Sequence, residues 1–110
     1  MLVGLLRRLA AGLADGRSDL FRAVIAACAR DAALAELVDA CVVRPRRQIM
    51  LGILERGVRR GEVRPGAVTD QVTEVGPAMI FHAVLTEGAP PPDDEVVSLV
   101  DNILMPILRP

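Results

Sequence analysis

The sequence predicts an all-α protein, a five-helix antiparallel bundle-like domain. Apolar residues recur at intervals of three and four over long stretches, which is the spacing of one helix face. No stretch alternates apolar and polar residues for long enough to form a strand. Glycine and proline separate the periodic stretches, where helices are expected to begin and end. At 110 residues, the chain is expected to be one domain spanning residues 1–110.

The first two helices are expected between residues 2 and 29. The first carries leucines on one face and should end at Asp15-Gly16, because glycine accepts the left-handed conformation that often follows a helix. Ser18 is expected to cap the second helix, which runs from 19 to 29. The leucines of the first face are Leu2, Leu5, Leu6, Leu9 and Leu13.

The third helix is expected to be the longest, from Ala32 to Arg60, with Asp31 as its N-cap. Pro45 lies in its interior and lacks the backbone N–H that a helix uses, so a kink is expected between 41 and 45. Gly61 should end this helix.

The fourth helix is expected from Val68 to Glu87, with Thr69 or Asp70 in its first turn. The pair Gly76-Pro77 should bend it, because proline removes one backbone hydrogen bond. Gly88 should stop it.

The last helix is expected from Asp93 to Leu108, with acidic residues in its first turn, where the helix dipole favours them. Its apolar residues occupy two adjacent lines on the helix surface. Such a wide apolar face is hard to cover within a chain of this size, and we interpret it as a surface shared with a second copy of the chain. One line contains Val96, Val100, Ile103 and Ile107, and the other contains Val97, Leu104 and Leu108.

Composition argues against several function classes. The net charge is −1, so the whole chain lacks the basic surface typical of nucleic-acid binding. Cys28 and Cys41 fit no zinc-ligand spacing, and we expect two buried thiols in a reducing cytoplasm, with a redox-sensing pair as the alternative. No nucleophile has a base at suitable spacing, so no enzyme, metal or cofactor is expected. No apolar run is long enough to cross a bilayer.

Two segments carry a resemblance to a known family. One runs from Val43-Arg44-Pro45-Arg46-Arg47 to the end of the third helix at 54–65, and the other is Leu85-Thr86-Glu87-Gly88-Ala89-Pro90 followed by Leu99-Val100-Asp101. In this order, they resemble the C-terminal, ligand-binding domain of tetracycline-repressor-type (TetR family) transcription regulators. The resemblance covers nearly the whole chain.

The resemblance implies an effector-sensing domain that forms a homodimer through its last two helices. It also implies DNA binding only through an N-terminal head, which we expect this chain to lack. The unknown small-molecule effector would be apolar or amphipathic and would lie among the central helices. Candidate pocket residues are Phe21, Met50, Ile53, Leu54, Met79, Phe81 and His82. Candidate interface residues are Leu85, Val96, Val100, Ile103, Leu104, Ile107 and Leu108.

Other interpretations of the same residues remain open. The aromatic pair and arginine that many relatives carry appear here as Phe81-His82-Ala83. His82 fits either a core hydrogen bond or a polar ligand contact. The cluster Arg44, Arg46 and Arg47 is expected to be a solvated face. The alternative function is a purely structural helical adaptor without a pocket, which a packed core around the two Phe and the central Met residues would favour.

Overall fold

The computed structural model describes residues 2–14 and 16–110. Within these residues every regular element is a helix and there is no strand, which confirms the predicted all-α class. Five rods are formed, because two pairs of helices continue through π-helical turns. In chain order the elements are α1 (Leu2–Gly12), α2 (Arg17–Cys28), α3 (Ala32–Val38), η1 (Asp39–Val43), α4 (Arg44–Arg59), η2 (Pro65–Ala67), α5 (Asp70–Glu87), α6 (Asp93–Leu99), η3 (Val100–Leu104) and α7 (Met105–Leu108).

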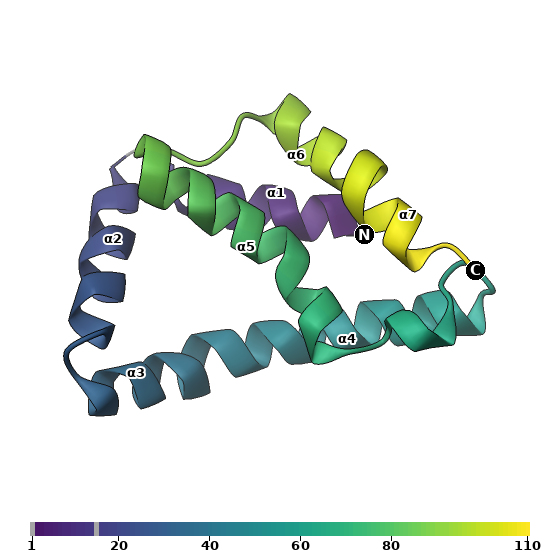
Figure 1. The fold of residues 1–110 in the computed structure, drawn as a ribbon, viewed down its shortest axis with the longest axis horizontal. Coiled ribbons are helices and arrows are strands. Elements are labelled where there is room, and N and C mark those ends of the chain that lie inside the picture. The colour runs from purple at the N-terminus through teal and green to yellow at the C-terminus, as the bar shows by residue number, and fades with distance from the viewer. Residues whose placement is uncertain (1, 15) are drawn as a thin grey trace.

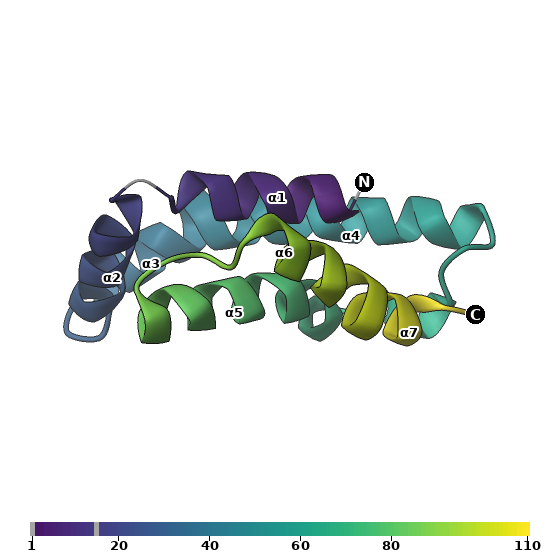
Figure 2. The same ribbon diagram turned by 90° about the horizontal axis from the view of Figure 1, so that it is seen from above.

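The rods form a flat, roughly triangular molecule of 42 × 31 × 17 Å. In Figure 1, the α3–η1–α4 rod forms one long side, and α2 stands at one end of it. The α6–η3–α7 rod, called the last rod below, stands at the other end. Figure 2 shows two layers, with α1 and α4 in one and α5, α6 and α7 in the other. No helix within the described ranges is long and apolar enough to cross a membrane.

Most predicted helix ends are confirmed. The Asp31 carboxylate accepts hydrogen bonds from the N–H groups of Ala33 and Leu34, both at 3.1 Å, and caps α3. Gly61 and Gly88 both adopt positive φ, 76° and 80°, where the long α4 rod and α5 end. These stops therefore follow from local backbone chemistry alone.

The prediction for Ser18 was wrong. It lies inside the first turn of α2, after the N-cap Gly16, and its hydroxyl donates to the carbonyl of Leu13. The serine is buried and ties α2 back to the end of α1. Asp15, predicted to end the first helix, lies outside the described residues.

Pro45 is accommodated by a π-helical turn, and the backbone stays helical through it. The N–H of Arg44 donates to the carbonyl of Asp39, five residues earlier, so the turn before the proline holds one extra residue. A wider turn gives the pyrrolidine ring room against the preceding carbonyls. The expected irregularity at 41–45 is therefore present, and it takes the form of a π turn.

A second π-helical turn precedes Pro106 in the last rod. The N–H of Met105 donates to the carbonyl of Val100, again five residues earlier. One extra residue rotates every later side chain by about 100° relative to a regular helix. Leu104 and Leu108 are thereby buried, at 2% and 1% exposure, while Ile103 is left 37% exposed. The two lines predicted from regular spacing are replaced by a buried line at 96, 100, 104 and 108.

The core gathers around α1, which contacts both α5 and α6. Leu6 is buried against α5 at Gly76, where a Cβ atom would lie 2.8 Å from a methyl carbon of Leu6. A bidentate ion pair from Arg7 to Asp93, at 2.6 and 3.0 Å, joins α1 to the start of α6 on the surface. The buried apolar residues of this core cluster are Leu6, Ala10, Leu13, Leu54, Ala67, Ile80, Val84, Val96, Leu99, Val100, Leu104 and Leu108.

The contact at Gly76 makes a testable prediction. Gly76→Ala should lower the free energy of unfolding by about 1–2 kcal/mol, because overpacking costs about 1–3 kcal/mol and helix propensity returns about 0.5–1 kcal/mol. Gly52→Ala is the matched control, since its Cβ would meet only a flexible guanidinium at 3.6 Å. That control should gain about 0.5–1 kcal/mol. Urea unfolding followed by circular dichroism measures both, and equal effects would contradict the close contact.

Candidate ligand pocket

The location predicted for a central pocket is filled by side chains. Phe21 of α2 stacks on Phe81 of α5 with ring centroids 4.8 Å apart and planes at 28°. The guanidinium carbon of Arg46 lies 5.1 Å from the centroid of the Phe81 ring, in cation–π geometry. The place where α2, α4 and α5 meet is therefore a packed cluster.

The solvated-face interpretation of the arginine cluster was wrong for two of its three members. Arg46 and Arg47 keep only 16% and 26% of their side-chain surface exposed, and both reach Glu74 of α5, at 3.3 and 3.4 Å. The Nε of Arg47 is buried without a hydrogen-bond partner. Arg44 alone fits the expectation, pairing with Asp39 at 3.0 Å on the surface. The α4–α5 contact is thus held partly by charge.

The other predicted pocket residues divide among three separate hollows. Met50 faces a small one of about 200 Å³ between α1 and α4, together with Arg46 and Pro77. Met79 and His82 line an open groove of about 290 Å³ between α5 and the α6–η3 rod. Ile53 and Leu54 belong to a third, at the end of α4. The seven residues therefore do not converge on one site.

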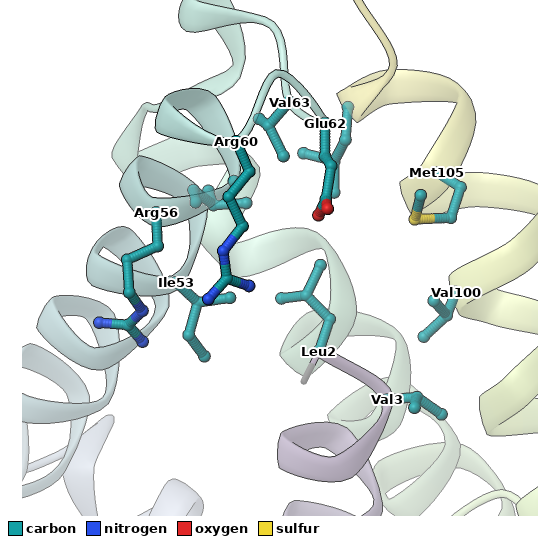
Figure 3. A pocket seen from close by; sticks show the side chains of 12 residues that line it. Leu2, Val3, Ile53, Arg56, Arg60, Glu62, Val63, Val100 and Met105 are labelled. Carbon is teal, nitrogen blue, oxygen red and sulfur yellow. The ribbon is translucent and has the colours of Figure 1, made fainter.

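The third hollow, drawn in Figure 3, is lined by both aliphatic and charged side chains. Its volume is about 230 Å³, and α1, α4, the loop after α4 and the last rod each supply part of its wall. Figure 3 shows the long side chains of Arg56 and Arg60 extending side by side from α4, with Glu62 between Arg60 and Met105. The lining residues are Leu2, Val3, Ile53, Leu54, Arg56, Gly57, Arg60, Glu62, Val63, Val100, Met105 and Leu108.

The loop after α4 is folded back to close this pocket. Gly57 allows it, because a Cβ atom there would lie 2.5 Å from a methyl carbon of Val63. The carbonyl of Gly57 accepts hydrogen bonds from the N–H groups of Glu62 and Val63, at 2.9 and 3.2 Å. These contacts place Glu62 and Val63 over the end of α4.

Arg64 fastens the last rod to the same loop. Its backbone N–H donates to the carbonyl of Leu108 at 2.8 Å, and its side-chain Nε donates to the carbonyl of Ile107, also at 2.8 Å. Both acceptors lie at the C-terminus of α7, where helix carbonyls have no partner within the helix. The pocket is thereby bounded by α4 on one side and α7 on the other.

Sequence reasoning missed most of this pocket. Arg56 and Arg60 are one helical turn apart, and their spacing was available from the sequence. Nothing local indicated that Leu2 and Met105 would meet them. Within residues 2–14 and 16–110, no three histidine, cysteine or acidic side chains gather as metal ligands.

The structure divides the predicted interface residues into two sets. Val96, Val100, Leu104 and Leu108 are buried within their own chain, since the π turn directs the last two toward the core. In this conformation these four side chains present almost no surface to a second copy of the chain. Leu85 and Ile103 are exposed, and Ile107 is partly exposed. The exposed members of the predicted interface therefore lie on α5 and on the last rod.

The Arg64 contacts make a prediction about local stability. Arg64→Ala removes the side-chain bond to Ile107, which is worth about 1 kcal/mol, and leaves the backbone bond in place. Amide hydrogen exchange at Leu108 and Arg109 should become several-fold faster, with little change in α1. Arg59→Ala, an exposed change on α4, should leave these amides unaffected. Unchanged exchange in the Arg64 variant would show that its side chain does not hold α7.

Comparisons with known proteins confirm the family resemblance. The chain matches the family described as "Tetracyclin repressor-like, C-terminal domain" over residues 2–103. Over 87 residues it is 30% identical to the uncharacterized HTH-type transcriptional regulators Rv1556 of Mycobacterium tuberculosis and Mb1581 of Mycobacterium bovis. The match covers 79% of this chain and 43% of each relative, so the chain spans less than half the length of these curated relatives.

No solved structure matches the chain significantly. The family match nevertheless covers nearly every described residue, and the all-helical fold agrees with it. The protein therefore belongs to the TetR family, as a tetracycline-repressor-like C-terminal domain.

Proposed function

We propose that this chain is the effector-sensing and dimerisation domain of a transcriptional regulator, and that it binds a small apolar or amphipathic molecule. One observation carries the proposal: the pocket at the end of α4 shares its wall with the last rod. Val100, Met105 and Leu108 line the pocket, while Ile103 of the same rod faces outward. A ligand in the pocket would therefore contact the rod that supplies the proposed dimer surface.

The proposed dimer surface is the groove between α5 and the last rod. Met79 and Ile103 line this groove as exposed large apolar side chains, and such residues are unusual on a free surface when they lie near one another. Leu85 is also exposed on α5, but it does not line the groove. His82, exposed on α5, also lines the groove. A second copy would cover the groove with the same groove of its own, as a twofold contact requires.

Transmission between the pocket and this surface would follow from packing. The last rod is held on one side by buried leucines and at its end by Arg64, so it moves as a unit with the loop after α4. A ligand that separates α4 from Met105 would shift the rod and with it Ile103. DNA binding by the whole regulator would belong to a part of the protein outside this chain, and the shift would alter the spacing between the two copies.

A structural adaptor is the second candidate function. The stacked Phe21 and Phe81 fill the place predicted for the ligand, and a domain without a pocket would be packed in this way. On this alternative, the hollow at the end of α4 would hold only water. The two candidates differ in whether any small molecule binds there.

The dimer surface is tested by Ile103→Asp. A charge at the centre of the contact would be buried without a partner, so the variant should be monomeric, at half the solution mass of the wild-type chain. Light scattering after size exclusion, over a range of concentrations, measures this against the chain mass of 11.8 kDa.

The matched control is Ile49→Asp, the same change at an exposed isoleucine of α4 away from the groove. It should keep the wild-type mass. A wild-type chain that is monomeric at every concentration would contradict the dimer, and an Ile103→Asp variant of unchanged mass would contradict the assigned surface.

A further inference from the structure

The pocket at the end of α4 carries an excess of positive charge on one wall. Arg56 and Arg60 are four residues apart and therefore share a helix face. Neither forms an ion pair with any carboxylate in the described part of the chain, whereas Arg7, Arg22, Arg44, Arg46 and Arg47 each do. The C-terminus of α4 contributes about half a negative charge, which two guanidinium groups outweigh. These two arginines are therefore available to a ligand.

The rest of the pocket wall is aliphatic. Leu2 and Val3 come from α1, Val63 from the loop, and Val100 and Met105 from the last rod. No aromatic ring lines the pocket, so a flat aromatic ligand would find no stacking partner. Methionine adapts to flexible chains, which suits an aliphatic tail.

Among the described residues that line the pocket, Glu62 alone is acidic, and it determines where an anionic group would lie. Its carboxylate stands between Arg60 and Met105 (Figure 3). An anion on that side would be repelled, while one beside Arg56 and Arg60 would be attracted by two charges. The polar head of a ligand is therefore directed toward α4 and its tail toward α1 and Met105.

We infer that the pocket binds a small aliphatic carboxylate, with its head at Arg56 and Arg60 and its tail over Leu2, Val63 and Met105. A planar carboxylate matches the fork of N–H donors that a guanidinium presents. The volume of about 230 Å³ is small for a ligand pocket and suits a short chain. The inference rests on the proposed function, since it names the ligand class of the same pocket.

Methionine methyl groups provide a direct test of position. Met105 lines this pocket, Met50 lines the hollow beside α1, and Met79 lines the groove by the last rod. With ¹³C-methyl-labelled methionine, sodium octanoate should shift the Met105 signal in a saturable manner and leave those of Met50 and Met79 largely unchanged. Octanol, which has the same chain length and no charge, serves as the comparison probe.

Arginine variants test the head group. The double variant Arg56→Gln with Arg60→Gln should weaken octanoate binding about fivefold or more and change octanol binding by less than about twofold. Arg59→Gln removes an arginine of α4 that does not line the pocket and should bind octanoate as the wild type does. Glu62→Gln should tighten octanoate binding about two- to threefold, because it removes a repulsive charge.

The outcomes separate this inference from the proposed function. Octanol and octanoate could both shift the Met105 methyl signal, with affinities that the double arginine variant leaves unchanged. The pocket would then bind apolar molecules, and the carboxylate assignment would be overturned. If neither probe shifts Met105, the inference fails, and the proposal that a ligand binds here fails with it. Equal shifts at Met50, Met79 and Met105 would indicate unspecific association and would also overturn the site.

Discussion

The close approach of α1 to α5 is the contact on which the other parts of the domain depend. Leu6 lies directly on Gly76, and only a residue without a side chain leaves room for it. From this contact α1 extends in two directions. Arg7 reaches the first turn of the last rod at Asp93, and Leu2 and Val3 reach the end of α4. One helix of eleven residues thus positions both the last rod and the pocket.

Two π turns determine which faces the long rods present. Each comes just before a proline, and each shifts the following side chains by one position. In the last rod, Leu104 and Leu108 consequently pack on the core, and Ile103 remains on the surface. The π turn before Pro106 thereby separates the leucines that pack on the core from an isoleucine that stays exposed.

The arginines in the first half of α4 differ from those in its second half in how they are paired. Arg46 and Arg47 are largely buried and share the carboxylate of Glu74, so they join α4 to α5 beside the stacked phenylalanines. Arg56 and Arg60 lie two turns or more further along α4, beside aliphatic side chains, and pair with no carboxylate of residues 2–14 and 16–110. The same helix therefore uses arginine to join α4 to α5 in its first half, and its second half carries the arginines of the proposed ligand site.

The helices and most of their ends could be predicted from the sequence, because these depend on local chemistry. The Asp31 cap, the glycine stops at 61 and 88 and the family resemblance are all readable from neighbouring residues. Tertiary structure decided which side chains share a site. Phe21 and Phe81 stack instead of lining a cavity, and Leu2, Arg60 and Met105 meet although they are far apart in the chain. Helical periodicity alone does not show where a π turn inserts an extra residue. Only the folded structure therefore shows that Ile103 faces outward.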